Sequence, residues 1–225
     1  AAVDLVARGR LAGARLPAYI GLPSTIRMGG SAAWELRGRI EHRGAGEWPL
    51  LLDVTSNLVG LQIDAPAPFT KAPPEPRATH VRLDIPGDRA NEITIGSGPA
   101  RAKLQFGDRD GQWQLQRGTA RFDGEPAELT TQPGLLVTGD WPQFDLAEWL
   151  ALGDTTTDAP PSASQGPRLK DWLGPIDVRL ARATVFGFEF TNVVAKLHGE
   201  PSGWRVDVGG PGGRRELAQH GHELG

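Results

Sequence analysis

The most informative absence in this sequence is cysteine, because none of its 225 residues is one. Disulfide bonds and thiolate metal sites are therefore excluded. The sequence also lacks an apolar run of the roughly 18 residues that a membrane-spanning helix needs. Its N-terminal residues have neither an initiating methionine nor the apolar core of a signal peptide. We therefore expect the chain to be an internal piece of a longer protein.

An excess of charge of either sign is missing too. The chain holds 24 lysines and arginines against 27 aspartates and glutamates, which gives a formal net charge of −3 at pH 7. The basic residues are scattered along the sequence, so they provide no broad attraction to nucleic acid or to anionic lipid. We therefore expect no nucleic-acid partner.

Motifs for catalysis and metal binding are weak or missing. Gly96-Ser97-Gly98 lacks the spacing of a nucleophile elbow and runs into Pro99 rather than into a helix. Residues 220–223 offer two histidines and a glutamate, but their spacing matches no well-defined metal site. No pair of carboxylates stands out from ordinary surface positions. We expect no enzyme activity, no metal and no cofactor.

What the sequence does contain is alternation of apolar and polar residues. In THVRLDI, the side chains of Val81, Leu83 and Ile85 point one way and the charged residues between them point the other. The 30 glycines and 19 prolines are spread between such runs as turns. This pattern predicts a mainly β fold, an extended antiparallel sheet in which each strand has one wet face.

A weak internal repeat supports this fold. Ala102-Lys103-Leu104 recurs as Ala195-Lys196-Leu197, and each copy is followed by a short polar loop and a tryptophan. The segment GRIEHRGAGEWPLLL is a looser third copy. A strand, a glycine-containing loop and a second strand led by tryptophan predict a hairpin unit, although such turns also recur by chance in β proteins.

One short helix is predicted at residues 145–152, in the segment WPQFDLAEWLALG. Asp145 is placed to cap it, and Glu148 occupies the third helical position. Phe144 and Trp149 occupy the two positions of a hydrophobic staple, and Gly153 ends the helix.

This helix divides the chain in our interpretation. Residues 1–153 form a β-rich segment that ends in the helix, and residues 154–168 are a linker or loop rich in proline, serine and threonine. Residues 169–208 continue the β structure. Residues 209–225 have lost the alternation and are expected to be disordered or a truncated tail.

The segment GLQIDAPAPFTKAPPEPR, residues 60–77, interrupts the strands. Apolar positions are even-numbered before Gly60 and odd-numbered after it, which predicts a glycine bulge in a strand. Pro66 and Pro68 then end the pairing because neither can donate to a ladder. Phe69 is expected to fold back as an apolar plug, with the ammonium group of Lys71 in solvent.

The sequence resembles the periplasmic region of the YhdP-type, AsmA-like proteins of Gram-negative cell envelopes. The likeness covers most of residues 28–208. The sequence departs from the family pattern in two ways: it lacks the N-terminal membrane anchor, and its tail does not continue as a strand. The stretches that carry it are residues 30–40, LLLDVTSNLVGLQIDAPAPFTK, WPQFDLAEWLAL and VFGFEFTNVVAKLHGEPSGWRVDV.

This resemblance implies a long, strongly curved antiparallel sheet of repeated hairpins, with one or two short helices and an apolar groove. It implies the periplasmic part of an inner-membrane-anchored protein that carries phospholipid between the inner and outer membranes. The expected partners are phospholipid acyl chains and the rest of the parent chain, including a membrane anchor outside this segment. Lys71 is a candidate contact for a lipid head group at the groove edge.

Apolar residues of the alternating runs are the candidate lining of this groove. These candidates are Val54, Leu58, Leu61, Ile63, Val81, Leu83, Ile85, Leu104, Phe106, Trp113, Leu115, Val178, Leu180, Phe186, Phe188 and Phe190. The alternative is a closed β-sandwich with a structural or assembly role in the envelope and no transport. The same alternation, and the same seven tryptophans, fit either a closed core or an open groove.

Overall fold

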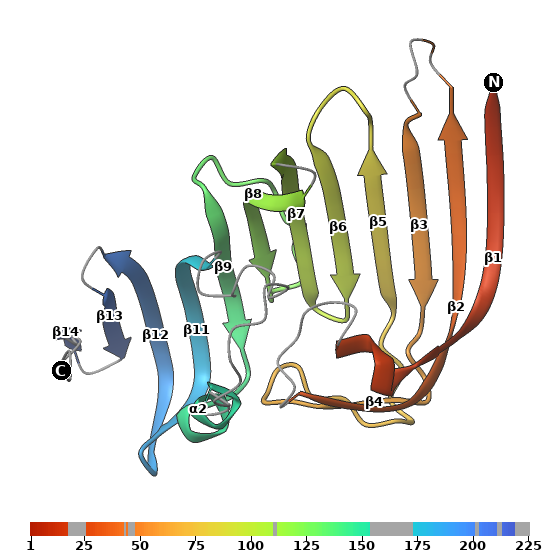
Figure 1. Cartoon of the computed structure of the whole chain (residues 1–225). Helices are drawn as coiled ribbons and strands as arrows, with labels where there is room; N and C mark the ends of the chain where they lie inside the picture. Colours follow the sequence, from red (N-terminus) through yellow and green to blue (C-terminus); the bar gives the residue numbers. More distant parts are fainter. Residues whose placement is uncertain are drawn as a thin grey trace, which may run out of the picture.

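The protein forms one open, curved β-sheet in the computed structural model (Figure 1). The structure describes residues 1–17, 26–42, 44, 48–109, 112–153, 173–200, 203–210 and 213–218. Within these residues the sheet has 14 strands and is accompanied by a single α-helix. The expectation of a mainly β fold with a curved sheet is confirmed.

Most strands follow one another across the sheet in sequence order. The main path is β1 (Ala2–Ala12), β2 (Arg27–Glu41), β3 (Leu50–Ser56), β5 (Thr79–Ile85), β6 (Asn91–Ser97), β7 (Ala100–Arg109), β8 (Gln112–Arg121), β9 (Gly134–Trp141), β11 (Leu173–Val185), β12 (Phe188–Glu200), β13 (Gly203–Gly210) and β14 (Gly213–Ala218). Two short strands lie off this path: β4 (Leu61–Asp64) pairs with β2, and β10 (Phe144–Asp145) pairs with β11. A 3-10 turn, η1 (Gly13–Arg15), follows β1.

The three sequence repeats are all hairpins. β2 pairs antiparallel with β3, β7 with β8, and β12 with β13. In each pair the two antiparallel strands follow one another in the sequence, and their side chains alternate between the faces of the sheet. The hairpin units that the sequence predicts are therefore confirmed.

The sheet also contains parallel pairs, which the alternation does not predict. β8 pairs parallel with β9, and β9 and β10 both pair parallel with β11. Parallel neighbours need a crossover connection, since a tight turn can join only antiparallel strands. The crossover from β9 to β11 contains the helix α2 (Leu146–Gly153), which explains why the helix lies at this part of the sheet.

The sequence places α2 within one residue at each end. The Asp145 carboxylate accepts hydrogen bonds from the backbone N–H groups of Ala147 at 2.8 Å and Glu148 at 3.4 Å. The rings of Phe144 and Trp149 stack with centroids 6.2 Å apart. Both the cap and the hydrophobic staple predicted from the sequence are therefore present.

Strand register brings apolar residues onto one side of the sheet, which we call the apolar face. One unbroken row of cross-strand partners crosses the sheet from β1 to β12. It consists of Ala7, Leu36, Val54, Val81, Ile95, Ala102, Ala120, Val137, Ile176 and Leu197. Because cross-strand partners share a face, the ten residues form a continuous apolar ladder.

A second row runs beside the first from β1 to β9. It consists of Leu5, Gly38, Leu52, Leu83, Ile93, Leu104, Gly118 and Leu135. Its two glycines make room for neighbouring leucines: a Cβ atom on Gly38 would lie 2.8 Å from Leu52 Cδ2, and one on Gly118 would lie 2.6 Å from Leu104 Cδ2.

The buried core occupies only one part of the apolar face. It lies on β9, β11 and β12, and Phe144 of β10 and Trp149 of α2 pack against it. The core residues are Val137, Trp141, Val178, Leu180, Ala183 and Val193. From β3 to β8, all residues of both rows except Gly118 are only partly buried. The described sheet is therefore open over most of this face rather than closed as a sandwich.

A corner at Gly30 and Gly60 separates β4 from the main sheet. Between Glu35↔Thr55 and Gly30↔Leu61, the β3–β4 side is one residue longer than β2. The extra residue predicted at Gly60 is therefore present, but it lies in a turn between two strands rather than inside one bulged strand. The backbone N–H of Ser31 donates to the Gly60 carbonyl at 3.0 Å, which holds the corner together.

The C-terminal part differs from expectation. Residues 213–218 form β14, which pairs antiparallel with β13, although the sequence predicts a disordered tail from residue 209. Pairing along β13 supplies backbone hydrogen bonds that do not depend on apolar alternation. The predicted linker at 154–168 and residues 219–225 lie outside the described residues.

Substitution of Gly60 by alanine tests the corner. Gly60 has φ 92°, and a Cβ atom there would lie 2.5 Å from the Ser31 carbonyl oxygen. We expect Gly60→Ala to lower the free energy of unfolding by about 2–4 kcal/mol, from backbone strain and the clash together.

Gly124→Ala is the matched control for this substitution. Gly124 also has a positive φ, 83°, but no atom lies within 4 Å of its added Cβ. It should cost only about 1 kcal/mol, the backbone strain alone. Urea denaturation of both variants measures the difference, and equal losses would show that the corner contact is unimportant.

Candidate functional site

The candidate site is the uncovered part of the apolar face, from β1 to β8. Six of the predicted lining residues lie on it in or beside the two rows, and each is partly exposed. These are Val54, Val81, Leu83, Ile85, Leu104 and Phe106. Leu115 and Trp113 extend the same face on β8, where Leu115 pairs with Phe106 and the Trp113 ring lies 6.1 Å from the Phe106 ring.

Several predicted lining residues lie elsewhere. Val178 and Leu180 are on the apolar face, but they are 4% and 5% exposed in the core beside α2 and so do not line an open surface. Leu61 and Ile63 belong to β4 at the corner, where Leu61 is 1% exposed. Leu58 lies in the turn before Gly60. The alternation identifies apolar positions but does not show which of them another element covers.

Other residues of this surface were missed. Leu52, Ile93 and Ile95 belong to the two rows on β3 and β6, between the predicted lining residues of neighbouring strands. Their signal was available in the sequence, because LLLDV and NEITIG alternate as clearly as the strands that were identified.

Three phenylalanines near the β11–β12 turn have exposed rings. Phe188 and Phe190 are 70% and 49% exposed and pair with Val185 and Ala183. Since Ala183 belongs to the core, its partner Phe190 shares the apolar face. Phe186 is in the turn itself, with φ 50° and 81% exposure.

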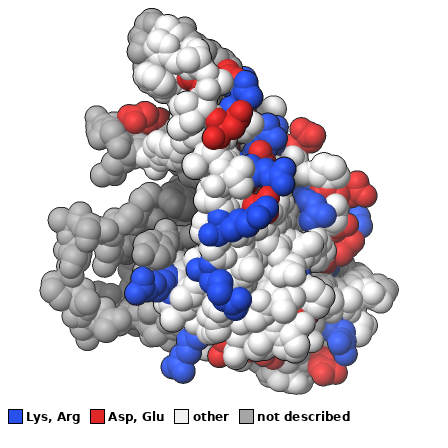
Figure 2. Space-filling view, turned by 90° about the vertical axis from the view of Figure 1, so that its right-hand side faces the viewer, with Lys and Arg blue, Asp and Glu red and all other residues white. Residues whose placement is uncertain are grey.

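The opposite face of the sheet is charged. Cross-strand ion pairs lie along it, such as Arg8–Glu35 at 2.8 Å and Lys196–Asp177 at 3.0 Å. Figure 2 shows lysine, arginine, aspartate and glutamate side chains intermixed along one side of the molecule (Figure 2). Hydrogen bonds from Arg37 and Arg8 lower the pKa of Glu35. The charged side chains keep this face of the sheet hydrated, and the apolar side chains lie on the other face.

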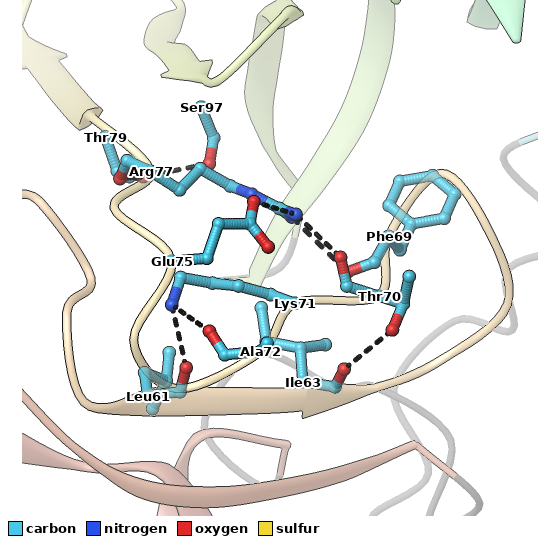
Figure 3. Close-up of polar contacts among 10 residues, drawn as sticks. All are labelled: Leu61, Ile63, Phe69, Thr70, Lys71, Ala72, Glu75, Arg77, Thr79 and Ser97. Carbon is cyan, nitrogen blue, oxygen red and sulfur yellow. Dashed lines mark hydrogen bonds and ion pairs between the residues drawn. The ribbon is translucent and has the colours of Figure 1, made fainter. Parts of the chain in front are cut away.

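Residues 65–78, which we call the strap, connect β4 to β5 across one end of the sheet (Figure 1). Lys71 lies within it and is 2% exposed. Its Nζ donates to the carbonyls of Leu61 at 2.9 Å and Ala72 at 3.0 Å (Figure 3). The prediction of a solvated lysine is wrong, because the turn at the corner folds the strap back along β4 and places Lys71 opposite Ile63.

This position removes Lys71 from the surface that a lipid head group would reach. Burial lowers the pKa of the Lys71 ammonium group. Two main-chain carbonyls use its donors, so its role in the structure is to hold the strap against β4. Arg77 adds to this by donating to the carbonyls of Phe69 at 3.3 Å and Thr70 at 2.6 Å.

The strap places Phe69 in an aromatic cluster with residues of the sheet and of α2. Figure 3 shows the Phe69 ring pointing away from the polar contacts of Lys71 and Arg77. Its ring centroid lies 5.4 Å from Phe122, 5.8 Å from Trp149 and 6.2 Å from Trp141, in edge-to-face arrangements. Phe69 therefore folds back as an apolar plug, as the sequence predicts.

The described residues contain no group of three or more side chains that could hold a metal ion. In the same part of the chain, no helix combines the length and the apolar character needed to cross a bilayer.

Comparison with protein families agrees with this architecture. The family model described as "YhdP protein" matches residues 1–220. The chain belongs to the YhdP family. This family is one of AsmA-like envelope proteins, as the resemblance in residues 28–208 implies. Comparisons with curated proteins and with solved structures gave no significant match.

Substitution of Phe69 tests whether the strap is fastened by its aromatic contacts. Phe69→Ala removes a ring that contacts three others, and we expect it to lower the free energy of unfolding by about 2 kcal/mol. Phe186→Ala is the matched control, since that ring is 81% exposed, and it should change stability by less than about 0.5 kcal/mol. Thermal unfolding of the two variants gives the comparison. Equal effects would mean that Phe69 does not fasten the strap.

Proposed function

We propose that this chain is a segment of a lipid-transfer protein that carries phospholipid across the periplasm between the inner and outer membranes. The observation that carries the proposal is the apolar ladder, which crosses ten strands without a charged residue. Membership of the YhdP family supports a role in the envelope. The membrane anchor that this role requires belongs to the parent protein outside this segment.

The free energy of transfer explains why an apolar ladder suits this role. Exposing an acyl chain to water costs roughly 0.8 kcal/mol of free energy for each CH₂ group, so a lipid with many such groups does not cross water unaided. Contact with an apolar surface at every step removes most of this barrier. No catalytic step and no cofactor is required.

The dimensions of the uncovered surface fit acyl chains. Neighbouring strands lie ~4.8 Å apart, so the uncovered part from β1 to β8 spans roughly 30 Å. The hydrocarbon core of a bilayer is also about 30 Å thick, so the acyl chains of one leaflet reach about half that distance. The surface is therefore long enough to hold an acyl chain, and the open side of the sheet leaves the head group in water.

The alternative of a closed, non-transporting sandwich has less support. A sandwich packs a second sheet about 10 Å above the first and buries the apolar side of both. In the part of the chain that the structure describes, the strands belong to one open sheet, and the rows from β3 to β8 remain partly exposed.

Photo-crosslinking in living cells tests the proposal directly. A benzoyl-phenylalanine crosslinker at position 83 replaces Leu83 on the apolar face, and one at the adjacent position 82 replaces Arg82 on the charged face. We expect ultraviolet light to attach phospholipid to the protein at position 83 and not at position 82, as measured by mass spectrometry. Equal labelling at both positions, or none at position 83, would argue against the proposal.

Phe188→Asp distinguishes an open surface from a closed core. Because Phe188 is 70% exposed, we expect the variant to keep its circular dichroism spectrum and unfolding midpoint. A charge in the path of acyl chains should nevertheless impair transport, measured as phospholipid arrival at the outer membrane.

Glu189→Ala is the control for this variant, because it changes the exposed neighbouring residue on the charged face and should leave transport intact. Unfolding of Phe188→Asp would instead support the closed sandwich, since a buried, unpaired charge is strongly destabilising.

A further inference from the structure

Two indole N–H groups lie buried without a hydrogen-bond partner in the aromatic cluster. They belong to Trp141 and Trp149, and they are the only buried side-chain nitrogen or oxygen atoms without a partner among the described residues. The two rings stack with centroids 5.7 Å apart and an interplanar angle of 19°. Buried tryptophan usually finds an acceptor for its N–H group, so two unsatisfied donors in one cluster require an explanation.

Water is a poor explanation. A buried water molecule needs two to four polar partners, whereas the described core residues and aromatic rings packed around these indoles are apolar. The neighbours are Phe69, Phe122, Phe144, Val137, Val178, Leu180 and Ala183. A ligand that is mostly apolar and carries acceptor oxygens suits these surroundings better.

The cluster is located where such a ligand would pass. Trp141 is on β9 and pairs with Leu180, at the boundary between the uncovered rows and the core beside α2. Trp149 comes from α2, whereas Phe69 comes from the strap and covers both indole rings edge-on. Phe69 is 37% exposed, so one side of this ring contacts the two tryptophans and part of it faces solvent.

We propose that Trp141 and Trp149 form a binding site for the oxygen acceptors of a lipid held on the apolar face. Displacement of the Phe69 ring opens the cluster, and the two indole N–H groups then donate to oxygens at the boundary between the acyl chains and the head group. Ester carbonyl oxygens and phosphate oxygens share this acceptor chemistry. The site rests on the proposed lipid-transfer function and adds the contact that recognises the polar boundary of the lipid.

Indole ¹⁵N–¹H spectra of the whole chain test this site with three probes. Dioctanoylglycerol has ester oxygens without phosphate, dodecylphosphocholine below its micelle concentration has phosphate without an ester, and dodecane has neither. We expect the Trp141 and Trp149 signals to shift downfield with one or both oxygen-bearing probes and not with dodecane. The probe that produces the shift identifies the oxygen that is bound.

Trp48 and Trp113 provide internal controls. They are 59% and 40% exposed and lie outside the cluster, so their N–H signals should not follow the same pattern. Trp149→Phe assigns one signal and keeps an aromatic ring while removing its donor. It should weaken binding of the effective probe roughly fivefold, the value of one hydrogen bond, and leave dodecane binding unchanged.

The outcomes separate this inference from the function on which it rests. If an oxygen-bearing probe binds but the two signals stay in place, or if dodecane shifts them equally, the tryptophan site is wrong and lipid binding stands. If none of the three probes binds, both the site and the proposed function fail.

Discussion

The structure depends on strand register more than on any single contact. Side chains alternate with a period of two, so a slip of one residue would move the apolar set of a strand to the charged face. Register is kept from β1 to β12 through ten cross-strand partners, all of them apolar. One-residue irregularities occur at the Gly60 corner, beside Phe106 in the β7–β8 hairpin, and between Leu173 and Ile176 where β11 meets β9. None of them interrupts the row of apolar partners. Paired charges on the other face reinforce the same register, because a slipped strand would lose them.

Local sequence signals predicted local structure well. The alternation identified strands such as β5, β7 and β12, and the positions of Asp145 and Trp149 predicted the helix, its cap and its staple, because each feature depends on residues close together in the chain. Features that depend on distant segments were not accessible. The parallel pairing of β9 with β11 and the burial of Val178 and Leu180 both follow from the crossover that carries α2. Lys71 is buried because the strap folds back along β4, which composition alone does not reveal.

The strap and α2 divide the apolar face into two parts with different properties. On β9, β11 and β12 the face is a packed core that stabilises the fold, and from β3 to β8 it is partly exposed. Phe69 belongs to neither part. Arg77 donates to its carbonyl and Lys71 holds the strap against β4, while the Phe69 ring reaches across to Trp141. One set of residues thus stabilises the sheet, and a different set forms its accessible apolar surface.

The two glycines of the second row determine the local depth of the apolar surface. At Gly38 and Gly118 the neighbouring leucine side chains occupy the space that a methyl group would fill. The row is therefore level across positions where larger residues would form a step. A single added carbon at either position would press on its leucine and narrow the surface locally without changing its charge. At Gly118 the added carbon would also lie 3.0 Å from the Lys103 carbonyl oxygen of the paired strand. Each glycine of this row is thus a position at which one added carbon would change the local width of the apolar surface.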